Sequence, residues 1–175
     1  MNTLARRIMQ LAVITVGFAG LFVAGNAVSG GATDAVGLTN ALLGRGTYQS
    51  HANLPFRSGL DIVTAKITVT PGGSSGWHSH PGGAIVIVQQ GDVTIYRSIR
   101  NGDDGSESDQ ERGGRFPHCV INTYTHGQSF VELPGEVDLV VNTGSTDYVL
   151  VATFPSVPVG GASRTDQPNP GTCPV

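Results

Sequence analysis

The sequence predicts an all-β protein. Of its 175 residues, 25 are glycine and 10 are proline, a composition that favours many short strands joined by turns over long helices. From residue 60 onward, short segments with strand patterns alternate with glycine, proline and polar residues. Because each short strand has to bury one face, we expect the strands to close into a sandwich or a small antiparallel β-barrel.

The strand pattern begins at residues 60–70, where apolar and polar residues alternate with a period of two. Residues 84–90, AIVIVQQ, form an apolar run that predicts a strand with little exposure to solvent and a dry barrel interior. Gly91 and Asp92 then turn the chain into a strand at 93–99, which predicts a hairpin with a short connection. Further strands are expected at 119–122, 128–133, 137–142 and 148–154.

Two segments depart from this pattern. Residues 33–43, TDAVGLTNALL, begin with Thr and Asp and predict a short N-terminal helix that ends at the turn from Gly44 to Gly46. Residues 101–115 are polar and acidic and predict a solvated loop. A calcium site is the alternative for this loop, although its acids do not follow the EF-hand spacing.

The first residues are typical of an export signal. Residues 1–7 carry two arginines, residues 8–25 carry no charge, and small residues follow, so we expect a signal peptide over 1–27, cleaved after Ala27. The apolar run is nearly long enough to cross a bilayer, and an uncleaved membrane anchor is therefore the alternative. Either outcome predicts a secreted or extracytoplasmic protein.

The remaining chain divides into an N-terminal extension at 28–57, a barrel at 58–155 and a tail at 156–175 that is rich in proline and glycine. In an oxidising compartment, Cys119 and Cys173 are expected to form a disulfide that ties this tail to the barrel. Two unrelated thiols are the alternative. The formal net charge is −3 and Lys66 is the sole lysine, so no basic stripe is available and nucleic acid is not an expected partner.

Two histidines lie one residue apart directly before the apolar strand. On a strand, His78 and His80 would point to the same face, where both imidazoles can reach one metal ion, whereas Trp77 would point away and pack. The alternative is a pair of exposed polar groups at the end of a loop. His118 and His126 are interpreted as surface histidines, with His126 as a weaker candidate for a further ligand.

The spacing around this pair resembles the first motif of the cupin family. Gly72 lies six residues before His78, and Gly91 lies eleven residues after His80, as in that motif. The slot that the motif gives to glutamate is Ala84 in this chain. The resemblance implies a single-domain cupin barrel, a double-stranded β-helix of the jelly-roll type.

A second segment resembles the second cupin motif. Gly127, Gly135 and Asn142 stand at the motif positions, the proline is shifted by one residue to Pro134, and the slot for histidine is Asp138. Together the two motifs span residues 72–142. The strand patterns on either side complete what such a barrel needs.

The resemblance also implies where a metal would bind. His78 and His80 match two of the family's ligands, Ala84 cannot bind a metal, and Asp138 is an acceptable carboxylate ligand for iron, manganese or zinc. Two histidines and one carboxylate form a facial triad that leaves coordination positions open. Because its side chain is shorter than that of histidine, Asp138 has a second interpretation, as an acceptor that orients an imidazole.

These observations predict a protein that binds a divalent metal and a small molecule at the barrel mouth, acting as a metal-dependent oxidoreductase or isomerase. Two other interpretations stay open. The first is a non-catalytic binding or storage module with a decayed metal site, which Ala84 favours. The second is a structural envelope protein that self-associates, for example as a homodimer.

Overall fold

A computed structural model describes residues 31–49, 56–99 and 118–175. The regular structure in these ranges consists of β-strands, which confirms the predicted fold class. Among the described residues, no helix has the length and apolar character needed to cross a membrane. The predicted export signal at 1–27 and the predicted loop at 101–115 lie outside the described residues.

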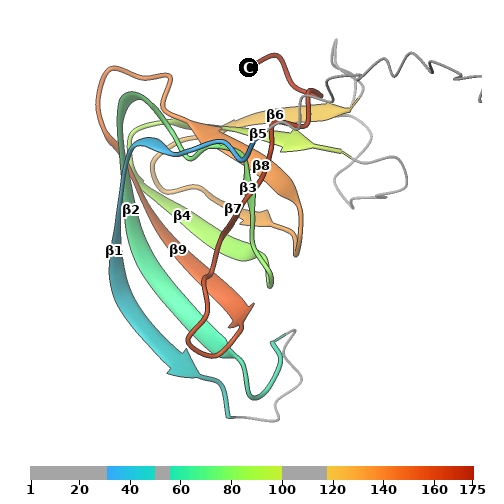
Figure 1. The fold of residues 1–175 in the computed structure, drawn as a ribbon. Coiled ribbons are helices and arrows are strands. Elements are labelled where there is room, and N and C mark those ends of the chain that lie inside the picture. The colour runs from blue at the N-terminus through green and yellow to red at the C-terminus, as the bar shows by residue number, and fades with distance from the viewer. Residues whose placement is uncertain (1–30, 50–55, 100–117) are drawn as a thin grey trace, which may run out of the picture.

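Ten antiparallel strands fold over into two facing layers (Figure 1). Their bounds are β1 Val36–Thr47, β2 Asp61–Ser74, β3 His78–Ser79, β4 Ala84–Gln90, β5 Val93–Ser98, β6 Cys119–Tyr124, β7 Ser129–Glu132, β8 Val137–Val141, β9 Tyr148–Val157 and β10 Thr165–Asp166. The first layer has the order β1-β2-β9-β4-β7, and the second has the order β10-β3-β8-β5-β6. The layers join where Ser74 pairs with Val141. This is the nearly closed barrel expected of a jelly roll.

The main hydrophobic core lies between the two layers. Its residues come from both layers and are mostly valine, alanine and aromatic side chains; they are Val63, Ala65, Val69, Ala84, Val86, Val88, Val93, Ile95, Phe130, Val140, Tyr148, Leu150, Ala152, Phe154 and Val157. Burial of apolar surface stabilises the barrel by roughly 25 cal/mol per Å² removed from water. The inner face of the barrel is therefore largely apolar.

Strand β4 is buried on one face only. Val86 and Val88 point into the core, whereas Ile85 and Ile87 lie on the outer face with 42% and 48% of their surface exposed. The prediction of a strand with little exposure is wrong for this outer half, because successive side chains of a strand point to opposite faces of the sheet. An apolar run alone does not tell whether a layer is covered on one face or both.

The predicted hairpin between residues 84–90 and 93–99 is wrong. β4 pairs with β7 and β9, whereas β5 pairs with β6 and β8, so Gly91 and Asp92 carry the chain from the first layer to the second. Gly91 has a φ of 72°, and a Cβ there would lie 3.0 Å from the carbonyl oxygen of Asp147. A short connection at the end of a barrel can therefore cross between layers as readily as it reverses a strand.

The predicted N-terminal helix at 33–43 is also wrong. Strand β1 covers most of this segment and pairs with β2 from Val36 opposite Ser74 to Thr47 opposite Asp61. In this strand Leu38 packs against the main core, whereas Leu42 is 63% exposed. Pairing with β2 satisfies the backbone instead, and tertiary context overrides local propensity.

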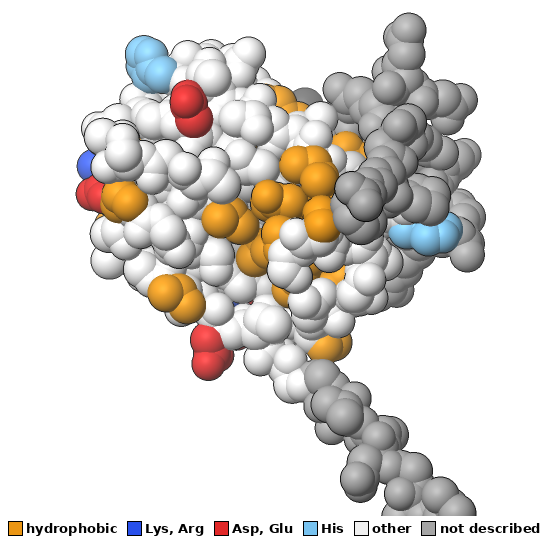
Figure 2. Space-filling view, turned by 90° about the horizontal axis from the view of Figure 1, so that it is seen from above, with side chains coloured by type: hydrophobic (Ala, Val, Ile, Leu, Met, Phe, Trp, Pro, Cys, Tyr) orange, Lys and Arg blue, Asp and Glu red, His pale blue; other side chains and the backbone are white. Residues whose placement is uncertain are grey.

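The C-terminal strap, residues 158–175, first pairs with β3 through β10 at the edge of the second layer and then continues to Cys173. Its disulfide between Cys119 and Cys173 confirms the predicted bond. Both cysteines pack with Trp77 in a second apolar cluster, so Trp77 faces away from the histidines as predicted. Figure 2, viewed from the side of β5 and β6, shows apolar side chains gathered on this face with few charged ones among them.

Candidate metal centre

The two histidines lie next to each other inside the barrel. His78 is on β3 and His80 follows it directly, and each side chain is about 95% buried. Their ring centroids are 4.8 Å apart and the rings are perpendicular. Phe154 of β9 lies against His80 with the ring centroids 4.6 Å apart. The pair is therefore held by packing rather than splayed into solvent.

Each ring has one nitrogen bonded to a backbone carbonyl. Nδ1 of His78 lies 3.0 Å from the carbonyl oxygen of Gly76, and Nδ1 of His80 lies 2.6 Å from the carbonyl oxygen of Ser163. A carbonyl only accepts, so Nδ1 donates in both cases. In the neutral rings, Nε2 then carries the lone pair. This is the arrangement of metal-binding histidines, whose other N–H is bonded to a carbonyl or carboxylate.

A buried glutamate completes the group. Glu132, at the end of β7, places Oε2 3.1 Å from Nε2 of His80. One ligand atom from each of His78, His80 and Glu132 lies within 4.8 Å of the others. Glu132 points inward because it lies two residues from Phe130, which packs in the core on the same face of the strand.

The contact between His80 and Glu132 requires a positive charge. With Nδ1 bonded to Ser163, Nε2 of a neutral His80 and the carboxylate oxygen would both present lone pairs to each other. A proton on the ring or a metal ion between the two atoms removes this repulsion. Two imidazole nitrogens and a carboxylate suit iron, manganese and zinc. The residues present therefore fit a divalent transition metal.

Burial and charge prepare these groups for binding a cation. Burial lowers the pKa of His78 to about 4, so its ring is neutral at higher pH and keeps a lone pair for a ligand bond. Burial raises the pKa of the Glu132 carboxyl, but the hydrogen bond with His80 and nearby positive charges outweigh that effect, and the pKa lies below its ordinary value. Glu132 is therefore an anion at neutral pH.

The comparisons with known proteins identify the family. The sequence profile of the family described as Cupin matches residues 32–163. The chain belongs to the cupin family. A search of the curated proteins finds no match.

Several solved structures resemble this cupin. Peruvianin-I, a cysteine peptidase from Thevetia peruviana latex, has a TM-score of 0.49 and 15% identity, over 75% of this chain and 68% of that chain. An oxalate oxidase in complex with the substrate analogue glycolate has a TM-score of 0.47 and 20% identity, over 69% and 51%. A cupin 2 conserved barrel domain protein from Salinispora arenicola has a TM-score of 0.42 and 21% identity, over 66% and 73%. This cupin therefore spans about half the length of that oxalate oxidase.

Asp138 lies beside His78 and outside the group of three. It stands opposite His78 in the pairing of β3 with β8, and its Oδ1 is 3.5 Å from Nδ1 of His78. That nitrogen is the one bonded to Gly76, so Asp138 is near the N–H side of the ring. Burial and the charges of Glu132 and Glu136 raise the pKa of Asp138 well above its ordinary value. Neither carboxylate oxygen of Asp138 has a hydrogen-bond partner among the described residues, and Asp138 is not one of the three convergent ligand residues.

Other predicted residues also have defined places. His118 and His126 are exposed and do not join the group of three. Asn142, from the second motif, is a structural residue: its side-chain amide donates to the carbonyl oxygens of Val69 and Thr146, and its Oδ1 accepts from the backbone of Gly144. These bonds fix the turn between β8 and β9.

The sequence prediction missed Glu132. It pairs directly with Ala84 across β4 and β7, so a carboxylate stands on the neighbouring strand, beside the slot from which the motif glutamate is missing. The available signal was the alternation of Phe130 and Glu132 within one short strand, which puts a charged residue on the core-facing side. A charge at a core position is costly unless it is paired, and is therefore a functional signal.

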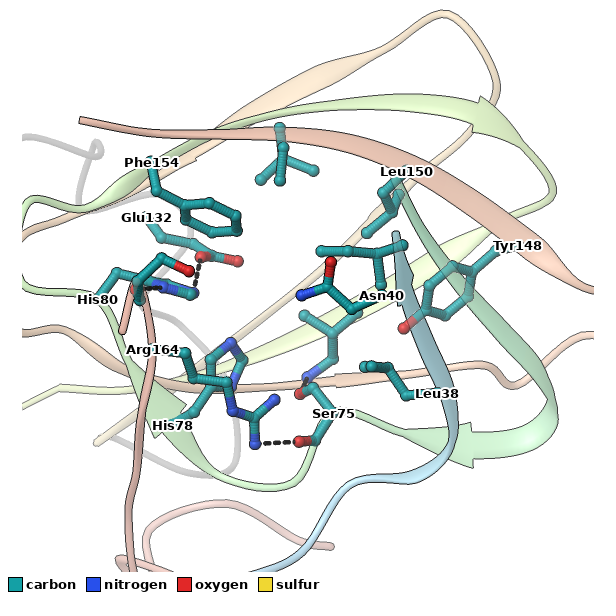
Figure 3. A pocket seen from close by; sticks show the side chains of 15 residues that line it. Leu38, Asn40, Ser75, His78, His80, Glu132, Tyr148, Leu150, Phe154 and Arg164 are labelled. Carbon is teal, nitrogen blue, oxygen red and sulfur yellow. Dashed lines mark hydrogen bonds and ion pairs between the residues drawn. The ribbon is translucent and has the colours of Figure 1, made fainter. Parts of the chain in front are cut away.

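The three residues line a cavity between the layers (Figure 3). Its volume is about 70 Å³. Its walls include Leu38, Ile67, Val86, Val140, Tyr148, Leu150, Ala152 and Phe154, and its polar edge includes Asn40, Ser75, Ser163 and Arg164. A site of this size admits a small ligand next to the three candidate metal ligands.

Proposed function

We propose that this cupin binds one divalent transition metal, iron, manganese or zinc, through Nε2 of His78, Nε2 of His80 and the carboxylate of Glu132. The observation that carries the proposal is the convergence of three buried ligand atoms, with both histidines already bonded at Nδ1. A bound divalent ion supplies a Lewis acid with coordination positions that remain open to a small molecule.

The protein residues set the conditions for that chemistry. Phe154 and the strap cover His80 and keep bulk water from it, which strengthens electrostatic interactions in the site. Glu132 neutralises one positive charge of the ion, and the hydrogen bond from Nδ1 of His78 to the carbonyl oxygen of Gly76 fixes that ring, with Asp138 3.5 Å away on the same side. These features suit a metal-dependent oxidoreductase or isomerase acting on a small molecule held in the cavity.

We also propose that the protein works outside the cytoplasm. The disulfide between Cys119 and Cys173 supports this proposal, because such bonds persist in oxidising compartments. The basic and apolar N-terminal residues support it independently, as an export signal. Detection of the mature chain in a culture supernatant or periplasmic extract, with a new N-terminus near residue 28, tests the proposal.

A non-catalytic binding module is the second candidate. The direct contact between His80 and Glu132 favours it, because a proton alone satisfies that pair. In that case, His78→Ala and His80→Ala would leave the uptake of a small ligand unchanged. In the metalloprotein, the same substitutions remove the metal and any ligand that depends on it.

Metal loading of the purified protein, with its disulfide formed, tests the proposal. After exposure to Mn²⁺, Fe²⁺ or Zn²⁺ and desalting, elemental analysis should find about one ion per chain. His78→Ala should weaken metal affinity by more than about 100-fold, since it removes a ligand. His126→Ala, which changes an exposed histidine, is the matched control and should bind normally. Absence of metal from the wild type, or equal losses in both variants, would refute the metal site.

A further inference from the structure

The cavity has one positively charged side chain at its edge. Arg164 belongs to the strap, and its side chain is 25% exposed. Nη2 donates a hydrogen bond to the carbonyl oxygen of Ser75, and Nε donates to the Asp166 carboxylate at 2.7 Å. Within the part of the chain that the structure describes, Nη1 has no hydrogen-bond partner. A ligand in the cavity can therefore still accept from this guanidinium.

The position of Arg164 is determined by the fold. β10 pairs Asp166 with His78 and Thr165 with Ser79, which places the preceding residue over the cavity. Figure 3 shows the guanidinium at the cavity edge, bonded to Ser75. Arg164 thus lines the same cavity as the candidate metal ligands, and it reaches the cavity from a segment more than 80 residues after the two histidines.

The charges around the cavity favour an anion. With a divalent ion bound, the inner surface carries two positive charges from the ion and one from Arg164 against one negative charge from Glu132. Asp166 compensates Arg164 in part, but its side chain is half exposed and therefore screened by solvent. Asp138 does not line the cavity and lies on the Nδ1 side of His78. The loaded cavity is left with a surplus of positive charge.

The cavity shape restricts which anion fits. A volume of about 70 Å³ limits the occupant to a few non-hydrogen atoms, such as a carboxylate with a short carbon chain. The apolar walls, which include Ile67, Leu150 and Phe154, suit that carbon chain. The Nη1 group of Arg164 can donate charge-assisted hydrogen bonds to a carboxylate oxygen, and such bonds are stronger than those to a neutral acceptor.

We propose that the cavity binds a small carboxylate whose oxygens lie between the metal site and Arg164. This inference rests on the proposed metal-binding function, since the ion supplies the larger share of the positive charge. Arg164 acts as a specificity residue: it selects the anion over a neutral molecule of the same shape.

Binding of propionate and of its neutral isostere propionamide tests the inference, by calorimetric titration of the metal-loaded protein. Propionate should bind at least about tenfold more tightly than propionamide. Arg164→Gln should remove this preference. Arg57→Gln, which changes an exposed arginine away from the cavity, is the matched control and should retain it.

Asp166→Asn provides a variant with the opposite expected result. It removes the carboxylate that competes for Arg164 while leaving the backbone pairing of β10 intact. Propionate should then bind several-fold more tightly, with propionamide unchanged. This gain cannot come from partial unfolding, so it separates recognition from damage to the strap.

The outcomes distinguish this inference from the proposed function. Equal binding of propionate and propionamide by metal-loaded protein would overturn the carboxylate proposal and leave the metal site standing. If elemental analysis finds no metal, the proposed function fails, and the titration is made on the metal-free chain. Binding of propionate that Arg164→Gln abolishes would then still support the carboxylate site, and binding insensitive to Arg164→Gln would overturn it.

Discussion

The two halves of the candidate site are held in different ways. His78 is bonded to the carbonyl of Gly76, two residues away, and faces Asp138 through the pairing of neighbouring strands. His80 is bonded to the carbonyl of Ser163, 83 residues away, and contacts Glu132 on the opposite side of the barrel. One half is therefore built within a single layer, from β3 and β8, and the other exists only when the strap and β7 are in place.

The two carboxylates show the same contrast. Both are almost completely buried next to a histidine. Glu132 faces Nε2 of His80, and hydrogen bonding with nearby positive charge keeps it ionised despite burial. Asp138 faces the N–H side of His78, and burial favours its neutral form. Burial alone therefore does not tell which carboxylate is a candidate metal ligand. The distinction is whether the carboxylate lies beside Nε2, which has the lone pair, or beside Nδ1, which carries the hydrogen.

The largest expected effect separates these two carboxylates. Glu132→Gln should weaken metal affinity by about 100-fold or more, since an amide is a poor ligand and removes a negative charge from the site. Asp138→Asn should weaken it less, by roughly 10- to 100-fold at most, the range for a residue that acts through a ligand. Competition titration with a metal-sensitive dye measures both affinities. If Asp138→Asn lost more metal affinity than Glu132→Gln, Asp138 would be the metal ligand in place of Glu132.

Removal of the disulfide should affect the half of the site around His80. Cys119→Ser combined with Cys173→Ser releases the strap that presents Ser163 to this ring, so metal affinity should fall by about tenfold. The free energy of unfolding should fall as well, by about 4 kcal/mol in the chain-entropy model for a separation of 54 residues. Titration is done at low temperature, where the variant stays folded. Unchanged affinity would show that the strap does not position His80.

The smallest expected effect is a pH dependence of stability that comes from Asp138. Burial raises the pKa of Asp138 in the folded protein above its value of about 4 in the unfolded chain. The protonated carboxyl group therefore stabilises the metal-free protein fully below about pH 4, and this stabilisation is lost as the pH rises through the folded-state pKa. Asp138→Asn has no such dependence, so its free energy of unfolding should improve relative to the wild type as pH rises. Urea denaturation at several pH values measures the difference. A difference independent of pH would contradict the raised pKa.

The sequence predicted the parts of the site that depend on local spacing. The histidine pair, Trp77 facing away, and the strand that begins at Ala84 all follow from the period of two along a strand. Glu132 could not be assigned in this way, because its role depends on the pairing of β7 with β4, and pairing partners are not encoded by periodicity.

The same limit explains the errors in the fold. The segment that forms β1 has the start signal of a helix, but the free edge of β2 provides backbone partners that a sequence pattern does not reveal. Gly91 is a turn residue in either a hairpin or a crossing between layers, and only the closure of the barrel decides between them. At β1 and at Gly91, the sequence predicts the local signal, a helix start or a turn. It does not predict which strand each segment pairs with or leads to.

The most direct test of the central claim is a crystal structure of the protein loaded with Zn²⁺ or Mn²⁺, with anomalous difference density recorded at the metal absorption edge. The account predicts a single peak per chain within bonding distance of Nε2 of His78, Nε2 of His80 and a carboxylate oxygen of Glu132, with Asp138 not bonded to the ion. A peak bonded to Asp138 in place of Glu132, or no peak at the histidine pair in fully loaded crystals, would contradict it.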